Sequence, residues 1–477
     1  MEVGATGSVL AEDPKVFDRL TRRGLLKGAA GAAVIVLANP LSARGYAQNA
    51  KVRFANVGVG GRGGHHLGPA GGEELVALCD TNRDALQKVG AKFPKAKGYD
   101  DWRKLFDEMR EKIDGVFIAT PDHTHFPVAY TAMKLGKHCY CEKPLTHSIW
   151  EARTLADLAR EKKASTQMGN DRHANEGNRL VVEWVQAGAV GTVTEVHTWT
   201  DRPIWPQGRK RPTYSDPVPA NLNWGAWLGV APERPHVAAW REPEYQKERK
   251  DVYHPFSWRG WHDFGCGAVG DMGCHTWDCV WWSMDPVAPT TVEPVKVVDK
   301  SDEMFPRQMI VRWEFPANGK RPAFTAYWYE GGLKPEVPEE IKNDPTRDKK
   351  ALPKSGSLFI GTKGKLLVAG DYGESPRIIP DSKMEEFKQR MPEKTIPRSP
   401  GHHVEFITAC KGEKPWDFPK SNFTYGGPLV EAMLLGNIAM RLGKKISWDP
   451  KAMKCPGTPE ADAIIKREYR KGFWQVA

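Results

Sequence analysis

The sequence lacks several patterns that would point to particular classes of protein. Its eight cysteines do not follow the spacing of a disulfide scaffold, and a chain of 477 residues is large enough to fold without one. No C-x-x-C pair is present, so the usual spacing of a structural zinc site is missing. The formal charge of +10 is not accompanied by a nucleic-acid recognition motif. A basic, soluble surface therefore explains this charge better than a nucleic-acid partner does.

A long apolar run is also lacking near the N-terminus. The uncharged stretch Gly28–Ala38 is too short to cross a bilayer. It follows Arg22 and Arg23 and leads to a small-residue site ending at Ala47, an order typical of an export signal. The paired arginines resemble the twin-arginine type, although a Sec signal or a frayed helix would explain them too. We expect residues 1–47 to be read by the Tat export machinery, which implies a periplasmic protein without a stable membrane anchor.

Strand patterns alternate with helical stretches in the first third of the chain. The apolar strand segments are Val52–Val59, Leu75–Asp80, Gly115–Thr120, His138–Cys141 and Ser165–Gly169. Alternation of this kind predicts an α/β fold with a doubly wound parallel sheet, that is, a Rossmann domain. Ligands of such sheets bind beyond the carboxyl ends of the strands, so the polar residues that follow the strands are the candidate site residues.

A glycine-rich segment follows the first of these strands. Gly58, Gly60 and Gly63 fit the G-x-G-x-x-G spacing, with Gly61 and Arg62 between them. The first glycine permits a tight turn, the second lets the backbone approach a pyrophosphate, and the third allows close helix–strand packing. We therefore predict that these five residues bind a dinucleotide cofactor on the N-terminus of the following helix.

The end of the second strand indicates which dinucleotide binds. Asp80 lies 22 residues after Gly58, where an acidic residue would bind the ribose hydroxyls of NAD. Asn82 and Arg83 follow, and an arginine here could hold the 2′-phosphate of NADP, so NADP is not excluded. A helix N-cap is the alternative role for Asp80. NAD is the predicted cofactor.

Three further motifs carry a family resemblance. They are Thr120-Pro121-Asp122-His123-Thr124-His125 after the third strand, Glu142-Lys143-Pro144 after the fourth, and the downstream Gly270-Asp271-Met272-Gly273-Cys274-His275. Together with the glycine loop, these motifs resemble the Gfo/Idh/MocA oxidoreductase family, which includes glucose–fructose oxidoreductase and inositol dehydrogenase. The resemblance covers about residues 51–450.

The resemblance implies two domains. A Rossmann domain over residues 48–170 would be followed, over residues 171–477, by a substrate and oligomerisation domain, an α/β domain with a large, mainly antiparallel open sheet. Such sheets often join family members into dimers or tetramers, so a homodimer or homotetramer is expected. Residues 200–262 and 331–356 exceed the short sugar dehydrogenases of the family, and we interpret them as insertions.

The resemblance also implies roles for individual residues. In this family the lysine of Glu-Lys-Pro is catalytic and contacts both the nicotinamide ribose and the substrate hydroxyl, and this role carries over to Lys143. The family's Asp-x-x-x-His pair corresponds to Asp271 and His275. Cofactor contacts are further predicted for residues at the carboxyl ends of the strands, namely Thr120, Pro121, His125 and Glu142.

The Asp271–His275 pair has the chemistry that hydride transfer requires. Oxidation of a carbinol needs a base that takes the hydroxyl proton, and histidine titrates near neutral pH. The two residues lie four apart on a predicted helix and so share a face. We predict that His275 is the base and Lys143 the polariser; the reverse assignment and a purely structural His275 are the alternatives. Adjacent Cys274 and His275 point to different sides of the helix, so no metal site is predicted.

Aromatic residues indicate the substrate class. Most of the 18 tryptophans lie between Trp184 and Trp328. Sugars present C–H faces that stack on aromatic rings, while charged or amide side chains bind the hydroxyls. We predict a carbohydrate substrate, contacted by Asn170, Arg172, Trp258, Arg259, Trp261, Asp271 and His275. The alternative is that most of the tryptophan rings belong to the core.

The predicted activity is oxidation of a carbohydrate CH–OH group by a nicotinamide dinucleotide that stays bound, because the periplasm has no ready pool of free nucleotide. A redox-neutral enzyme that cleaves a glycoside through transient oxidation is the first alternative. A non-catalytic sugar-binding protein is the second. The glycine loop together with Lys143, Asp271 and His275 argues against the second alternative.

Overall fold

The computed structural model describes residues 51–247 and 249–476, which belong to one compact unit, Arg44–Ala477. The predicted export signal lies outside the described residues. Within the described ranges, no helix combines the length and the apolarity needed to cross a membrane. All eight cysteines lie in the described part of the chain, and each is buried and unpaired.

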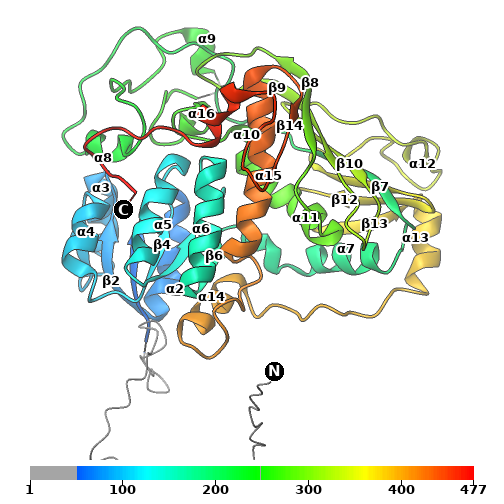
Figure 1. The fold of residues 1–477 in the computed structure, drawn as a ribbon, viewed down its shortest axis with the longest axis horizontal. Coiled ribbons are helices and arrows are strands. Elements are labelled where there is room, and N and C mark those ends of the chain that lie inside the picture. Colours follow the sequence, from blue (N-terminus) through cyan, green and yellow to red (C-terminus); the bar gives the residue numbers. More distant parts are fainter. Residues whose placement is uncertain (1–50, 248, 477) are drawn as a thin grey trace, which may run out of the picture. The chain divides into compact units, whose positions relative to one another are not determined.

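Six parallel strands form a sheet in the order β3-β2-β1-β4-β5-β6 (Figure 1). They are β1 Arg53–Val57, β2 Glu74–Cys79, β3 Lys97–Tyr99, β4 Gly115–Ile118, β5 His138–Cys141 and β6 Thr166–Met168. The strand order reverses between β1 and β4, the point at which such sheets bind their ligands. This Rossmann-type arrangement confirms the predicted fold of the first domain. The sequence pattern missed β3, which is short and not apolar.

Helices connect these strands on both sides of the sheet. They are α2 Leu67–Gly72, α3 Arg83–Gly90, α4 Trp102–Met109, α5 Asp122–Lys134 and α6 Ile149–Lys162. A capping box begins α6, since Ser148 and Glu151 exchange side-chain to backbone hydrogen bonds. Asn82 caps α3, its side chain accepting from the first backbone N–H groups of the helix. The alternative role of Asp80 as the N-cap is therefore wrong.

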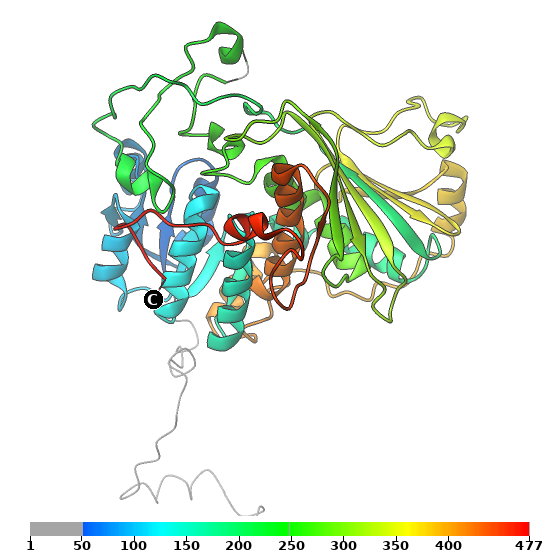
Figure 2. The same ribbon diagram turned by 45° about the horizontal axis from the view of Figure 1, so that its top comes forward.

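Eight strands form a second sheet in the order β13-β12-β11-β7-β10-β9-β8-β14 (Figure 2). They are β7 Val193–Trp199, β8 Thr291–Val298, β9 Gln308–Phe315, β10 Phe324–Glu330, β11 Gly356–Gly361, β12 Gly364–Ala369, β13 Ser375–Ile379 and β14 Ile446–Ser447. In the described strands, β7 and β10 pair in parallel and the other neighbours pair antiparallel. The predicted fold class, with a large mainly antiparallel second sheet, is confirmed. The domain boundary at residue 170 stays a prediction.

The two predicted insertions consist mostly of irregular chain. Residues 200–262 contain α8 Trp224–Leu228 and α9 Pro243–Gln246, and residues 331–356 contain α12 Glu339–Lys342. The remaining α-helices are α7 Glu176–Gln186, α10 Gly267–Thr276, α11 Asp278–Met284, α13 Asp381–Lys388, α14 His402–Cys410, α15 Phe423–Leu442 and α16 Asp462–Ile465. Tryptophans of the first insertion form a core cluster of their own. For these rings, the core alternative is the better description.

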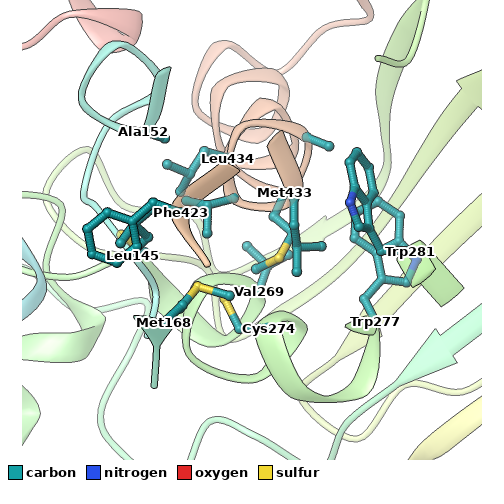
Figure 3. Close-up of a cluster of buried hydrophobic side chains, with 14 of the residues drawn as sticks. Leu145, Ala152, Met168, Val269, Cys274, Trp277, Trp281, Phe423, Met433 and Leu434 are labelled. Carbon is teal, nitrogen blue, oxygen red and sulfur yellow. The ribbon is translucent and has the colours of Figure 1, made fainter. Parts of the chain in front are cut away.

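One long helix, α15, lies between the two sheets and packs against α6 on one side and against β8 and β9 on the other (Figure 1). Figure 3 shows part of the shared core, built from Leu145, Ala152, Met168, Val269, Cys274, Trp277, Trp281, Phe423, Met433 and Leu434. These side chains belong to one continuous buried cluster. The core therefore extends across the predicted domain boundary, which fixes α10 relative to the Rossmann sheet.

We expect Gly63→Ala to destabilise the protein. A Cβ at this position would lie 1.9 Å from the carbonyl oxygen of Gly58, where no side chain fits without a backbone shift. The melting temperature should fall by roughly 5 °C or more, a loss of about 2–4 kcal/mol. Gly64→Ala is the matched control, because a Cβ there would meet only the Val59 carbonyl at 4.0 Å. Equal melting temperatures in differential scanning fluorimetry would contradict the expectation.

Candidate active site

The glycine loop follows β1 and leaves its backbone open at the second glycine. Gly58 has a φ of +85°, and a Cβ on it would lie 2.4 Å from the Ala119 carbonyl oxygen, so glycine is required there. At Gly60 a Cβ would meet only an oxygen of Asp80, at 3.7 Å. Packing within the protein therefore does not explain the glycine at position 60. Space kept free beside a loop backbone fits the pyrophosphate of a dinucleotide.

Asp80 contacts the same loop from the end of β2. Its Oδ2 accepts from Val59 N at 2.9 Å and from Gly60 N at 3.2 Å, and its Oδ1 accepts from Asn82 N at 2.9 Å. These bonds fix a carboxylate beside the loop, with lone pairs left for further donors. Ribose hydroxyls are donors of that kind, which fits the predicted role of Asp80.

The predicted cofactor residues Arg62 and Glu142 pair with each other. Arg62 Nε donates to Glu142 at 2.9 Å, and Arg62 Nη2 lies 3.1 Å from Asp171. His66 Nε2 lies 3.1 Å from the same Glu142 oxygen. Burial acts to raise the pKa of Glu142, but the His66 imidazole and the Arg62 guanidinium hold that pKa well below its usual range. The carboxylate is therefore charged. Arg62 thus joins the glycine loop to Glu142 after β5 and to Asp171 after β6.

His125 joins the loops that follow β4 and β5. Its Nδ1 lies 2.8 Å from the Pro144 carbonyl oxygen, and its Nε2 lies 2.8 Å from the Thr120 carbonyl oxygen. Both ring nitrogens thus face the backbone, and the cofactor contact of His125 stays a prediction. Its place beside Pro144 makes it a residue that positions Lys143. Pro121 precedes α5 as its N-cap residue. In the described chain, the buried hydroxyl of Thr120 has no hydrogen-bond partner, which leaves it available to a ligand.

Lys143 and Arg259 share the carboxylate of Asp271. Lys143 Nζ donates to the Asp271 backbone oxygen at 2.8 Å and to its Oδ1 at 2.9 Å, and Arg259 Nε donates to Oδ1 at 3.2 Å. Burial acts to raise the pKa of Asp271, but the two cations hold it well below its usual range. An ammonium group has three donors, so one N–H of Lys143 remains for a substrate oxygen. The structure therefore brings the lysine of the Glu-Lys-Pro motif into direct contact with Asp271, a contact that the sequence did not predict.

His275 lies one turn after Asp271 on α10, on the predicted shared face. Burial and the charge of Lys143 lower the pKa of His275 to about 4, so its imidazole is uncharged at neutral pH. No partner for its buried Nδ1 occurs among residues 51–247 and 249–476. A neutral imidazole with an unused nitrogen beside a lysine can accept a proton from a substrate hydroxyl.

Two residues near this cluster were given no role from the sequence. Asp122 begins α5, and its Oδ2 accepts from Cys266 N at 3.1 Å, which joins α5 to the start of α10. Burial raises the pKa of Asp122 to about 7, although Arg259 acts against the shift. The Tyr372 ring contacts the His275 ring with centroids 5.0 Å apart, and the Arg172 guanidinium lies 5.5 Å from the Tyr372 centroid. Tyr372 therefore lies beside His275, with Arg172 next to the Tyr372 ring.

Position in the sequence could have identified one of them. Asp122 stands in a quoted motif at the carboxyl end of β4, where site residues are expected. Tyr372 lies in the loop between β12 and β13, about 100 residues after His275, and no local pattern marks it.

Three predicted substrate residues prove to be structural. Trp261 is fully buried, and its Nε1 donates to the Val252 carbonyl oxygen at 2.7 Å, so neither face of the ring is available to a sugar. Trp258 is 7% exposed, and the Arg259 guanidinium packs on its ring, 4.3 Å from the ring centroid. Asn170 is buried; its Nδ2 donates to the Cys274 carbonyl oxygen at 3.3 Å, and its Oδ1 accepts from Ser421. The direct substrate contacts predicted for Trp261, Trp258 and Asn170 are thus corrected to packing and positioning roles.

The described residues contain no group of three or more His, Cys, Asp or Glu side chains arranged to hold a metal ion. Two cysteines close to His275 in the sequence donate to the backbone. Cys266 Sγ donates to the Thr146 carbonyl oxygen, and Cys279 Sγ donates to the Thr276 carbonyl oxygen.

A buried carboxyl lies on β10, which packs against α10. Glu330 accepts from Trp328 Nε1 at 2.8 Å, and burial raises its pKa to about 8. A carboxyl whose pKa is raised by folding stabilises the protein below its unfolded pKa, and that contribution is lost as pH rises to the folded value. The window for Glu330 therefore runs from about pH 4.5 to about pH 8.

We expect Glu330→Gln, which is neutral at every pH, to stabilise the protein at the alkaline end of this window. The difference in unfolding free energy between variant and wild type should grow by ~2–4 kcal/mol between pH 5 and pH 8.5. Urea unfolding at both pH values measures it. Glu385→Gln on the surface of α13 is the control, and a pH-independent difference for Glu330→Gln would contradict the expectation.

Two segments of the chain match one known protein family. Residues 52–170 match the NAD-binding Rossmann fold of the Gfo/Idh/MocA oxidoreductase family, and residues 181–310 match the C-terminal alpha/beta domain of that family. Together these segments span about half of the chain.

Curated relatives match a shorter stretch. "Glycosyl hydrolase family 109 protein 1" of Akkermansia muciniphila is 29% identical over 153 residues, which are 30% of this chain and 31% of that protein. Levoglucosan dehydrogenase of Pseudarthrobacter phenanthrenivorans is 26% identical over 134 residues, 27% of this chain and 34% of that protein. The chain thus matches about a third of the length of these relatives.

Solved structures extend the likeness in fold to most of the chain. The WlbA dehydrogenase from Bordetella pertussis, in complex with NADH and UDP-GlcNAcA, has a TM-score of 0.55 at 17% identity and covers 84% of this chain and 99% of its own. The glycine loop, the Lys143–Asp271–His275 cluster and the two sheets agree with the two family matches. The chain belongs to the Gfo/Idh/MocA family of oxidoreductases, with an NAD-binding Rossmann domain followed by the family's C-terminal α/β domain.

Proposed function

We propose that this protein oxidises a CH–OH group of a carbohydrate with an NAD molecule that stays bound between turnovers. The observation that carries the proposal is the cluster in which Lys143 and Arg259 share the Asp271 carboxylate beside an uncharged His275. This cluster offers a cationic donor and a neutral base to one hydroxyl. Bound NAD supplies the hydride acceptor.

Each side chain of the cluster has a distinct task. The remaining N–H of Lys143 binds the substrate hydroxyl oxygen and stabilises the negative charge that develops on it. His275 takes the hydroxyl proton. Asp271 orients the ammonium, and Arg259 holds Asp271 in place. Because the Lys143 and Asp271 side chains are only 14% and 13% exposed, their charges act with little screening by water.

The substrate class rests on the aromatic and polar residues around His275. The half-buried Tyr372 ring offers a face to a sugar, and Arg172 beside it can bind hydroxyls. Levoglucosan dehydrogenase and aldose–aldose oxidoreductase, which are named for sugars, are among the similar proteins and structures and support this proposal.

Redox-neutral cleavage of a glycoside is the second candidate, and the similarity to glycosyl hydrolase family 109 proteins favours it. In this reaction a ring hydroxyl is oxidised to a ketone, which acidifies the neighbouring C–H bond. Loss of that proton and of the glycosidic leaving group gives an unsaturated ketone. Water adds to it, and the hydride returns to the carbonyl carbon. The net reaction is hydrolysis and needs no second redox substrate.

The compartment and the assembly state belong to the same proposal. The twin arginines Arg22 and Arg23 favour export of the folded protein to the periplasm with its NAD already bound. A homodimer or homotetramer is proposed from the family resemblance. Cell fractionation of the full chain and its mass in solution test these two points.

A panel of sugars and aryl glycosides, given to the purified full chain without added nucleotide, tests the two activities. Simple oxidation predicts that reduced nicotinamide accumulates to the level of bound cofactor while no bond breaks. The redox-neutral reaction predicts repeated release of the aglycone without such accumulation. A protein that carries no nucleotide and acts on no sugar, even with NAD added, would overturn both.

A further inference from the structure

Residues 220–223 of the first insertion pair with residues 81–84, the loop between β2 and α3 that follows Asp80. The contacts are the Asn82–Leu222 bridge, Arg83 N to Asn221 O (2.8 Å), Asn223 N to Thr81 O (2.9 Å) and Asn221 Nδ2 to Asp84 Oδ2 (2.6 Å). In Figure 1 this is where α8, which directly follows the segment, lies beside α3. A segment of the first insertion, from the predicted second domain, therefore contacts the loop that follows Asp80.

The same segment helps to hold the Arg83 guanidinium. Its Nη1 donates to the Ala220 carbonyl oxygen at 2.6 Å. Its Nε and Nη2 donate to Asp100 Oδ2, in the loop between β3 and α4, at 3.1 and 2.7 Å. All three guanidinium nitrogens therefore have partners within the protein.

This arrangement matters for cofactor choice because Arg83 is the cation that follows Asp80. The Asp80 carboxylate, fixed by three backbone N–H groups, can accept from ribose hydroxyls. The same carboxylate repels a 2′-phosphate unless a nearby cation compensates for the charge. The bonds to Asp100 and Ala220 hold the Arg83 guanidinium in place, and the Asp100 carboxylate already compensates for its charge.

We propose that the 220–223 segment and Asp100 make this protein selective for NAD over NADP, by keeping the Arg83 guanidinium from the 2′ position of the ribose. The insertion thus acts as a specificity element of the cofactor site. This proposal rests on the proposed function in one respect, namely that the purified protein retains its bound nucleotide.

The experiment identifies the nucleotide released when the purified, full-length protein is denatured, by mass spectrometry, and does not depend on activity. Wild type should release NAD(H) with a small share of NADP(H). Asp80→Ser removes the repelling charge, and Asp80→Ser combined with Asp100→Ala also removes two of the three hydrogen bonds that hold Arg83, leaving the one to Ala220. The ratio of NADP(H) to NAD(H) should be about tenfold higher in the double variant than in Asp80→Ser alone.

Two further variants identify the cause of such a change. Adding Arg83→Ala to the double variant should return the ratio to that of Asp80→Ser, because the phosphate partner is then gone. Asp107→Ala removes an exposed carboxylate from α4 and should leave the wild-type ratio unchanged. Melting temperatures check that each variant is folded.

The other possible results each contradict either the proposed selectivity for NAD or the proposed retention of the nucleotide. Wild type that carries mainly NADP(H), or a double variant no different from Asp80→Ser, overturns the selectivity while leaving the proposed function intact. Wild type without any nucleotide overturns the proposed retention instead. In that case titration of the empty protein with NAD and NADP, followed by thermal shift, measures the same ratios, and equal affinities in wild type overturn the selectivity.

Discussion

Replacing Lys143 with methionine should lower kcat about a thousandfold while the protein stays folded. Methionine is unbranched like lysine and one atom shorter, and it removes both hydrogen bonds to Asp271 and the N–H left for the substrate. Loss of a charged donor at the developing oxyanion and of its orienting ion pair accounts for ~3–4 kcal/mol of the barrier. Steady-state kinetics on the best substrate of the sugar and glycoside panel measures the effect.

Lys134→Met is the matched control for this variant. Lys134 ends α5, at the opposite end of that helix from Asp122, is exposed, and lies with its Nζ 5.8 Å from the centroid of the Tyr130 ring. Its substitution should leave kcat within about twofold of wild type. If Lys143→Met keeps kcat within tenfold of wild type at unchanged KM, the lysine is not the polariser and the proposed mechanism fails.

The Rossmann half could be predicted from the sequence because its signals are local. The spacing of Gly58, Gly60 and Gly63 reflects contacts within one turn and one neighbouring strand, and the structure shows those contacts. The acidic end of β2 and the motif after β5 stand at the same edge because parallel strands align their carboxyl ends. Local sequence and sheet topology together therefore predict where the cofactor residues lie.

The substrate side was predicted less well, for a physical reason. Aromatic residues interleaved with charged ones occur in sugar-binding sites, and they also occur in protein cores that contain ion pairs. The sequence does not show which aromatic rings are buried, and burial is what distinguishes the two cases. Trp261 is fully buried, whereas Tyr372, which the sequence did not suggest, is half-buried against His275. Tyr372 reaches the site through the strand order of the second sheet, which no spacing in the sequence encodes.

Replacing His275 with glutamine should lower kcat/KM about a hundredfold or more across neutral pH, and the pH profile should identify the base. A base acts when it is deprotonated, so activity that depends on His275 falls as pH drops through about 4. Wild type should therefore show no loss attributable to His275 between about pH 5 and pH 8. His197→Gln is the control and should keep wild-type activity. His197 lies on β7 of the second sheet, outside α10.

The reverse assignment predicts a different profile. If Lys143 were the base, its ammonium would have to lose a proton before the reaction, and kcat/KM would rise on the alkaline side of neutrality. His275→Gln would then lose less than about tenfold and keep that alkaline rise. A flat neutral profile combined with a large loss in His275→Gln excludes Lys143 as the base and supports proton transfer to His275, since Lys143 donates to Asp271 in the resting site. The pair of measurements therefore decides between the two assignments without a bound substrate structure.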